Sequence, residues 1–397
     1  MNRPRLYLKR HEDRRLRSGH LWAFSNEIDT ARSALTALQP GELVTLCDSG
    51  GNPLGSAYVN PRSLICARLF SRHPNAAFDR DLIERRLYRA LALRERLFDG
   101  PYYRLAFGES DRLPGLVVDR FGDVLAVQIT TAGVERIKDE VIAALVRMFA
   151  PRAVVLRNDG AVRALEGLES YVATGAGTCP ETIEIEENGA RFEIAPLSGQ
   201  KTGWYFDHRA NRARTASYVR DLRVLDLFSY CGAWAVQAAR YGAREILCVD
   251  DSATALEAAR RNAAFNGVDE RVATDCGDAF EVLRTLRDER RRFDAVILDP
   301  PAFIKRRKDI KAGVDAYRRI NQLAMQVLAE DGWLITSSCS FHMPADLLVR
   351  TVSQAGRQIG RHLQIVEQGH QAADHPVHPA IAETNYLKTF FVRVHGG

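Results

Sequence analysis

Short apolar segments alternate with longer amphipathic stretches from about residue 196 to the end of the chain. The segments 223–227, 245–250 and 293–299 are rich in Val, Ile and Leu, as strands buried on both faces are. The pattern predicts strands that end near Asp226, Asp250, Val272 and Asp299, and a later strand at 333–336. Strands alternating with helices predict an α/β fold with a doubly wound, mostly parallel sheet.

The first half of the chain has a different pattern. Strands are expected at 41–48, 55–59, 64–70 and 153–157, and helices at 78–98 and 134–149. Hairpins are expected at 116–129, turning at Gly122–Asp123, and at 182–194, turning at Asn188–Gly189. We therefore expect a β-rich domain at 1–75, an α+β middle domain at 76–195 and the α/β domain at 196–397.

Composition excludes several classes of protein. The chain has 397 residues, is 46% hydrophobic and carries a net charge of +5, which is typical of a globular protein of two or three domains. Its seven cysteines form no C-x-x-C pair, which argues against a disulfide framework or a zinc site. Without a membrane-length apolar run or a secretory signal, we expect no metal, no membrane partner and a reducing, cytoplasmic location.

A glycine turn after the strand at 223–227 predicts a cofactor site. One glycine, Gly232, without a full G-x-G-x-x-G spacing suits a nucleoside that carries no phosphates. We expect Asp226, Phe228, Tyr230 and Gly232 to bind this group, in the manner of S-adenosylmethionine enzymes. The alternative is a parallel-sheet domain in which a strand merely ends in Asp and Gly.

Two further carboxylates follow the next strands. Asp250 ends the strand at 245–250, where a carboxylate accepts hydrogen bonds from a ribose diol. Asp278 follows the third strand, where it can accept a hydrogen bond from the adenine amino group. Either side chain can instead cap a helix.

The segment 293–303 predicts a rigid ledge at the carboxyl edge of the sheet. Asp299 ends an apolar strand, and Pro300 and Pro301 fix the following backbone. We expect Asp299 to contact both cofactor and substrate, and Pro300 and Phe303 to contact a base taken out of its RNA context. A strand that ends in a proline-terminated loop without function is the alternative.

Cys339 is the candidate nucleophile. It follows the apolar strand at 333–336, which predicts that it shares an edge with Asp299. A thiolate can add to C6 of a cytosine and make C5 nucleophilic enough to accept a methyl group. Asp299, held protonated or sharing a proton, would assist at N3. A small buried cysteine is the alternative.

A glycine-punctuated segment at 198–209 precedes the α/β domain. We expect a lid or entry loop in which Tyr205 contacts the cofactor and Gln200, Lys201 and Arg209 contact the substrate. The alternative is a loop that caps a helix beginning at Asp207. The adjacent Asp374 and His375 are expected to be structural.

These motifs together resemble one family. The runs at 199–209, 228–232, 299–303, 338–340 and 371–376 are similar to those of bacterial large-subunit ribosomal RNA cytosine-5 methyltransferases. The resemblance covers nearly the whole chain, and the N-terminal module resembles a PUA RNA-binding domain. It implies a Rossmann-like class I methyltransferase domain with a seven-stranded sheet, S-adenosylmethionine as cofactor, ribosomal RNA as partner and Cys339 as nucleophile. Two positions depart from the family: His208 replaces an expected glutamine, and Ala302 a frequent lysine.

Three functions are weighed. The first is RNA cytosine-5 methylation through Cys339, and the second is RNA N-methylation at an exocyclic amine held by the Asp299 ledge. The third is an RNA-binding assembly factor that retains the fold without activity; methylation of a small molecule is a further alternative. A monomer and a homodimer are both compatible with the sequence.

Overall fold

The computed structural model describes residues 3–396, and the chain divides into two units. Among these residues, the first unit holds 3–183, 194–206 and 373–384, and the second holds 184–193, 207–372 and 385–396. Within residues 3–396, no helix combines the length and the apolar character that a membrane crossing requires.

The first unit begins with a five-stranded sheet in the order β1-β3-β4-β5-β2. Its apolar core contains Leu46 and Ala57 from adjacent strands. The expected strand at 64–70 begins only at Ala67, because the preceding residues form a turn in which Leu64 is 79% exposed. The elements are β1 (Arg5–Tyr7), α1 (Arg14–Arg17), β2 (Trp22–Ala23), β3 (Glu42–Cys47), β4 (Pro53–Val59) and β5 (Ala67–Ser71).

A second five-stranded sheet follows in the order β10-β9-β8-β7-β6. The hairpin expected at 116–129 is confirmed, and the helix expected at 78–98 forms as α2, but 134–149 is broken where Ile137 leaves the helical conformation. The elements are α2 (Arg80–Leu97), β6 (Tyr102–Phe107), β7 (Leu116–Phe121), β8 (Val124–Ile129), α3 (Ala132–Glu135), α4 (Lys138–Phe149), β9 (Ala153–Asn158) and β10 (Tyr171–Gly177).

Tyr58 joins these two sheets. Its ring belongs to the core of the second sheet, and its hydroxyl donates to the carbonyl oxygen of Pro114 at 2.8 Å. Helix α3 approaches this ring at Gly133, where an added Cβ would lie 2.2 Å from a ring atom. The close approach requires glycine at this position.

The second unit contains the seven-stranded sheet in the order β15-β14-β13-β16-β17-β19-β18. All pairs are parallel except those of β19. The third strand begins at Val272, whereas the sequence led us to expect an end there. The strands are β13 (Arg223–Leu227), β14 (Glu245–Asp250), β15 (Val272–Cys276), β16 (Phe293–Leu298), β17 (Leu328–Ser338), β18 (His362–His370) and β19 (Lys388–His395).

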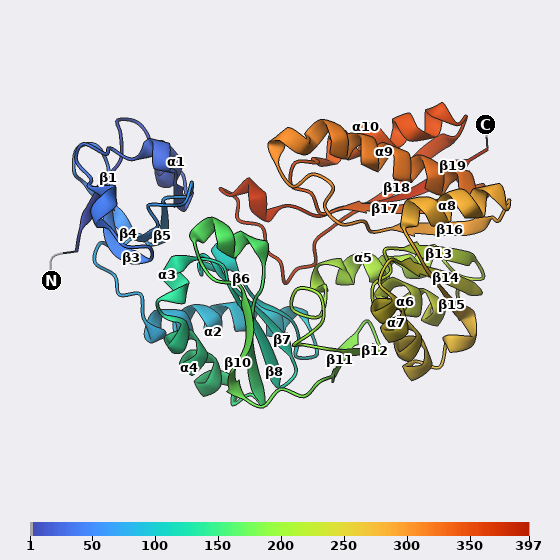
Figure 1. The fold of residues 1–397 in the computed structure, drawn as a ribbon, viewed down its shortest axis with the longest axis horizontal. Helices are drawn as coiled ribbons and strands as arrows, with labels where there is room; N and C mark the ends of the chain where they lie inside the picture. The colour runs from blue at the N-terminus through green and yellow to red at the C-terminus, as the bar shows by residue number, and fades with distance from the viewer. Residues whose placement is uncertain (1–2, 397) are drawn as a thin grey trace. The chain divides into compact units, whose positions relative to one another are not determined.

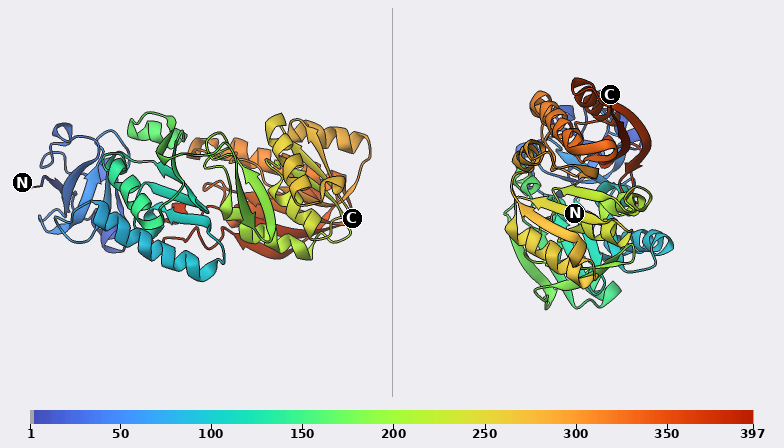
Figure 2. Two further views of the ribbon diagram at one scale, coloured as in Figure 1. Left: turned by 90° about the horizontal axis from the view of Figure 1, so that it is seen from below. Right: turned by 90° about the vertical axis from the view of Figure 1, so that its right-hand side faces the viewer.

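Helices cover both faces of this sheet, with α8, α9 and α10 on one face and α5, α6 and α7 on the other (Figures 1 and 2). The hairpin of β11 (Ile183–Glu187) and β12 (Ala190–Ile194) was expected at these residues. The helices are α5 (Arg209–Arg214), α6 (Ala233–Arg240), α7 (Ala253–Phe265), α8 (Ala279–Asp288), α9 (Ile310–Val327) and α10 (Ala345–Gln358).

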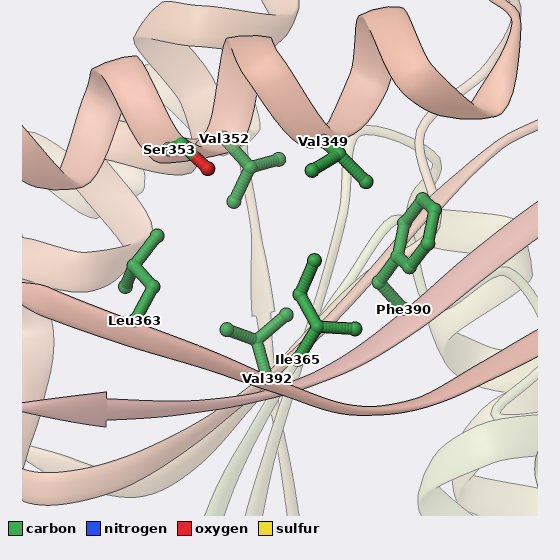
Figure 3. Close-up of a pocket in the computed structure, with 7 residues that line it drawn as sticks. All are labelled: Val349, Val352, Ser353, Leu363, Ile365, Phe390 and Val392. Carbon is green, nitrogen blue, oxygen red and sulfur yellow. The ribbon is translucent and has the colours of Figure 1, made fainter.

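A cavity of about 190 Å³ lies between α10 and strands β18 and β19 (Figure 3). Its lining is apolar apart from Ser353 and includes Val349, Leu363 and Phe390. None of the predicted site residues lines it, so this cavity is separate from the predicted site.

Gly133→Ala is expected to destabilise the first unit by about 1–3 kcal/mol, because the new methyl group must displace the Tyr58 ring. Gly160→Ala is the matched control, since its φ of −70° suits alanine and nothing lies within 4 Å of the added Cβ. Urea unfolding of both variants measures the difference. Equal stability of the two variants would contradict this account of the Tyr58 contact.

Candidate functional site

The turn after β13 is held in a strained conformation. Phe228 and Tyr230 have φ values of 63° and 48°, which bulky residues rarely adopt, and Gly232 has a φ of 78°. At Gly232, an added Cβ would lie 3.0 Å from the Cβ of Ala259 in α7. Such strain persists only where surrounding contacts fix the backbone, and it is concentrated at binding sites.

Asp250 fixes this turn. One of its carboxyl oxygens accepts a hydrogen bond from the backbone N–H of Tyr230 at 2.8 Å, and the other accepts from Ser252 at 3.0 Å. Burial raises the pKa of Asp250. A carboxylate oxygen can accept more than one hydrogen bond, so Asp250 keeps acceptor capacity for a ribose hydroxyl.

Asp278 caps helix α8. One oxygen accepts from the backbone N–H groups of Phe280 and Glu281 at 2.9 and 3.1 Å. The side chain is exposed, and its second oxygen remains available beyond this cap. Asp278 therefore does cap the helix, and its contact with the cofactor stays a prediction.

Asp226 lies behind the turn rather than on its surface, since its side chain has no exposed area. Burial raises the pKa of Asp226 well above its usual value, and the nearby Asp299 and Asp250 act in the same direction. The site therefore favours the protonated form of Asp226 more than water does. From this buried position, Asp226 is suited to supporting the turn after β13 and not to contacting a ligand at its surface.

Asp299 is held by two donors that the sequence did not identify. Nε2 of His208 lies 3.0 Å from one carboxyl oxygen, and the indole N–H of Trp234 donates to the other at 3.0 Å. Asn211 faces Nδ1 of His208 at 3.3 Å, so that Nε2 carries the proton that faces Asp299. The glutamine-to-histidine departure at 208 thus retains an N–H donor to this carboxylate.

These donors decide the protonation of Asp299. Burial would raise the pKa of Asp299, but His208 and Trp234 outweigh it and hold the pKa below its usual value. Asp299 is therefore ionised near neutral pH. Of the two states expected for Asp299, the protonated one is wrong, because burial alone does not control this carboxyl group; the shared proton stays a prediction.

Cys339 follows β17 at the same edge of the sheet as Asp299. The register pairs Leu298 of β16 with Thr336 of β17, so both residues lie just beyond adjacent strand ends. The Cys339 side chain is half-buried. The flanking serine hydroxyls are both within 3.0 Å of the Tyr317 hydroxyl, which fixes the backbone on either side of the sulfur.

Lys388 is a further residue of this cluster that the sequence analysis did not identify. It is buried at the start of β19, and its ammonium group donates to the carbonyl oxygens of Ser340 and Tyr386, each at 2.7 Å. Burial lowers the pKa of Lys388 to about 8, and the neighbouring Cys339 acts in the opposite direction. The sequence signal was weak, because Lys388 is the first residue of a strand that also contains Arg393.

Phe303 packs in an aromatic cluster. Its ring centroid lies 4.8 Å from that of Tyr317, and the rings of Phe280 and Phe228 are 6.2 and 6.5 Å away. Pro300 is buried. The ledge is therefore rigid, and packing is the role of Phe303 that these contacts establish.

The segment 198–209 divides between the two units. Gln200, Lys201 and Tyr205 belong to the first unit, where the Tyr205 hydroxyl donates to Gln200 at 2.9 Å and the Lys201 ammonium lies 4.4 Å from the centre of the Tyr205 ring. Thr202 donates to Asp119 at 2.6 Å, so this part is anchored to β7.

Arg209 belongs to the second unit and lies 3.5 Å from Glu187, with its side chain 12% exposed. This pairing makes it a weaker candidate for a phosphate contact. In the first unit, His375 and Asp374 are buried at 2.8 Å from each other, and Asp374 also accepts from the backbone N–H of Arg104. These buried contacts hold the two residues within the first unit, which agrees with the structural role expected for them.

Clusters of three or more metal-binding side chains do not occur between residues 3 and 396.

Comparisons with known proteins agree with this geometry. Residues 6–72 match a family described as PUA-like domain, and residues 166–393 match one described as S-adenosylmethionine-dependent methyltransferase. Ribosomal RNA large subunit methyltransferase I of Erwinia tasmaniensis is 39% identical over 98% of this chain and 99% of its own. The protein of the same name from Klebsiella pneumoniae is 39% identical over 98% of each chain.

A solved structure of a SAM-dependent methyltransferase from Streptococcus mutans covers 98% of this chain and 100% of its own, with a TM-score of 0.84 at 21% identity. This likeness shows the shared fold. The family match spans more than half of the chain, and the two relatives align over nearly all of it. The chain therefore belongs to the S-adenosylmethionine-dependent methyltransferases, in the family of ribosomal RNA large subunit methyltransferase I.

Proposed function

We propose that this protein methylates C5 of a cytosine in large-subunit ribosomal RNA through a covalent bond between Cys339 and C6. The observation that carries the proposal is the half-buried Cys339 beside the Lys388 ammonium, on the edge that also holds Asp299. The names of the relatives support ribosomal RNA as the substrate. A methyltransferase that acts on an exocyclic amine has no use for a thiol at this position.

The residues around the turn fit S-adenosylmethionine. Asp250 retains acceptor capacity for the ribose hydroxyls, and the exposed second oxygen of Asp278 suits the adenine amino group. The absence of a phosphate-binding glycine series agrees with a nucleoside that has no phosphates. When bound, the cofactor supplies an electrophilic methyl group.

The proposed reaction assigns a role to each group at the edge. The Cys339 thiolate forms a bond to C6, the C5=C6 electron pair shifts through the ring, and N3 takes up a proton from solvent. C5 would then form a bond to the methyl carbon while the bond from that carbon to the cofactor's sulfur breaks, leaving the sulfur as a neutral thioether. A base from solvent takes the C5 proton, and the C–H electron pair restores the C5=C6 double bond as the bond between C6 and the Cys339 sulfur breaks. The thiolate leaves, and N3 returns its proton to solvent.

In this proposal, Asp299 and Lys388 stabilise the charges that the reaction requires, on the ring and on the thiolate. As a carboxylate, Asp299 accepts a hydrogen bond from the N3–H or the exocyclic amine, and so stabilises the protonated ring. The Lys388 cation favours the thiolate form of Cys339 in a site partly shielded from water. His208 and Trp234 orient the Asp299 carboxylate.

RNA N-methylation is the second candidate. The Asp299–Pro300–Pro301 ledge favours it, because an ionised carboxylate at a rigid turn can orient an exocyclic amine. In that reaction Cys339 has no role. The identity of the methylated atom therefore separates the two candidates.

Cys339→Ser is expected to lower methylation of ribosomal RNA by at least about a thousandfold, because an alcohol does not replace a thiolate as nucleophile near neutral pH. Labelled S-adenosylmethionine and nucleoside mass spectrometry measure the product. Wild type should yield 5-methylcytidine, and calorimetry should give unchanged cofactor binding in the variant. An N-methylated base, or full activity of the variant, would favour the second candidate.

Lys388→Met is expected to move the pH profile of Cys339 alkylation to higher pH, because loss of the cation disfavours the thiolate. A shift of one pH unit lowers the rate at neutral pH about tenfold. In wild type, the stabilisation of the Cys339 thiolate by Lys388 should be lost as pH rises through about 8, where Lys388 loses its proton. Site-resolved mass spectrometry after iodoacetamide gives the rates.

The exposed Cys276 serves as internal reference, and Lys388→Arg, which keeps the charge, is the matched control. Arginine should retain most of the reactivity of Cys339. A profile that does not differ between wild type and Lys388→Met would exclude the electrostatic role of Lys388.

A further inference from the structure

A basic segment, residues 305–311, lies immediately after the Asp299 ledge and runs into the first turn of α9. Five exposed cations occur between Ile304 and Gly313, with Asp309 as the only acid among them. None of the five forms an ion pair or side-chain hydrogen bond with residues 3–396. These cations, here called the ledge cations, are Lys305, Arg306, Arg307, Lys308 and Lys311.

Many other arginines of the chain are neutralised internally. Arg94 pairs with Asp111 at 2.7 Å, and Arg212 pairs with Glu187 at 2.6 Å. The ledge cations are not neutralised by acidic side chains of residues 3–396, so their charge is available to a partner outside the chain. A run of like charges repels itself, so this segment is stabilised when an anion binds.

The base of the segment is fixed next to the candidate nucleophile. The backbone N–H of Ile304 donates to the Ser340 hydroxyl at 3.3 Å, and Ser340 directly follows Cys339. Helix α9 reaches the same backbone, since a Cβ on Gly313 would lie 3.0 Å from the Phe303 carbonyl oxygen. The segment therefore leaves the site from a defined point.

The chemistry of the cations indicates the partner. Arginine and lysine both bind phosphate, arginine through paired N–H donors and lysine as a point charge. A single RNA strand carries one phosphate per nucleotide, so a base that enters the site brings neighbouring phosphates to its rim. A row of unneutralised cations at that rim supplies the charge opposite to that of these phosphates.

We propose that the ledge cations bind the phosphates of the RNA strand next to the methylated nucleotide. The proposal rests on the proposed function for the position of that nucleotide. It assigns the phosphate contacts to residues 305–311, which follow the position where Ala302 lacks the lysine expected from the family resemblance. The contacts set affinity and register, and they carry no sequence preference.

The chain offers a matched control at the amino end of β16, the strand whose carboxyl end precedes the ledge cations. Arg290, Arg291 and Arg292 are exposed, precede β16 and form no ion pair with the described residues. They lie at the amino end of the strand, whereas the ledge cations follow its carboxyl end. Two variants, each lacking three charges at one end of β16, have the same net charge. A difference in their RNA binding therefore reports a local contact and not the change in net charge.

The test compares Arg306→Ser/Arg307→Ser/Lys308→Ser with Arg290→Ser/Arg291→Ser/Arg292→Ser. Fluorescence anisotropy measures the binding of a labelled single-stranded RNA at several salt concentrations. The first variant should bind about tenfold or more weakly at physiological salt, and the slope of log K against log salt should fall by roughly 2. The second variant should remain within about threefold of wild type. Because all six residues are exposed, both variants should unfold at the wild-type temperature.

Equal weakening in the two variants would overturn the proposal, since it would show that net charge alone acts. Wild-type RNA affinity in the first variant would also overturn it. Binding is measured without methyl transfer, so its outcome is separate from that of the cytosine assay. If wild type makes no 5-methylcytidine but the first variant alone loses affinity, the phosphate contact stands and the proposed reaction fails.

Discussion

The parallel pairing of β13, β16 and β17 is the constraint on which the site depends. Leu227 pairs with Leu298, and Leu298 pairs with Thr336, so three strand ends come together at one edge. A different segment follows each strand at this edge. A strained turn follows β13, a double proline follows Asp299 after β16, and a cysteine between two serines follows β17. A slip in register between these strands would separate Asp299 from Cys339, whatever their chemistry.

Burial at this edge fixes the charges in a definite pattern. Burial raises the pKa of Asp226 behind the turn, whereas two N–H donors hold the pKa of Asp299 below its usual value. Lys388 is placed by two backbone carbonyl oxygens rather than by an acid, so its charge is not cancelled by a carboxylate. Charged groups held in this way need little reorganisation during a reaction, which is the main source of electrostatic catalysis.

Sequence patterns predicted the parts of the structure that depend on local information. The strand before Asp299 and the Asn188–Gly189 hairpin follow from apolar periodicity and turn chemistry. Leu64 was wrongly placed in a strand, because its apolar neighbours gave no sign of the turn that exposes it. Val272 was assigned to the end of the third strand instead of its beginning, since β15 is polar toward its end.

The contacts of the site were harder to predict because they join distant segments. His208 was noticed only as a departure from a resemblance, and its role depends on a meeting with Asp299 that periodicity does not encode. Lys388 reaches the Cys339 segment because β19 runs antiparallel beside β17, with Ser338 opposite Lys388. The residue types of the site were readable from the sequence, whereas their protonation states required burial and partners.

The covalent adduct with cytosine is the central claim, and trapping tests it most directly. RNA in which cytidine is replaced by 5-fluorocytidine should react with the protein and S-adenosylmethionine but stall, because C5 has no proton to lose. The account predicts an RNA–protein complex that survives denaturation and maps by peptide mass spectrometry to Cys339. A complex on another residue, or methylated RNA with no trapped complex, would contradict the account.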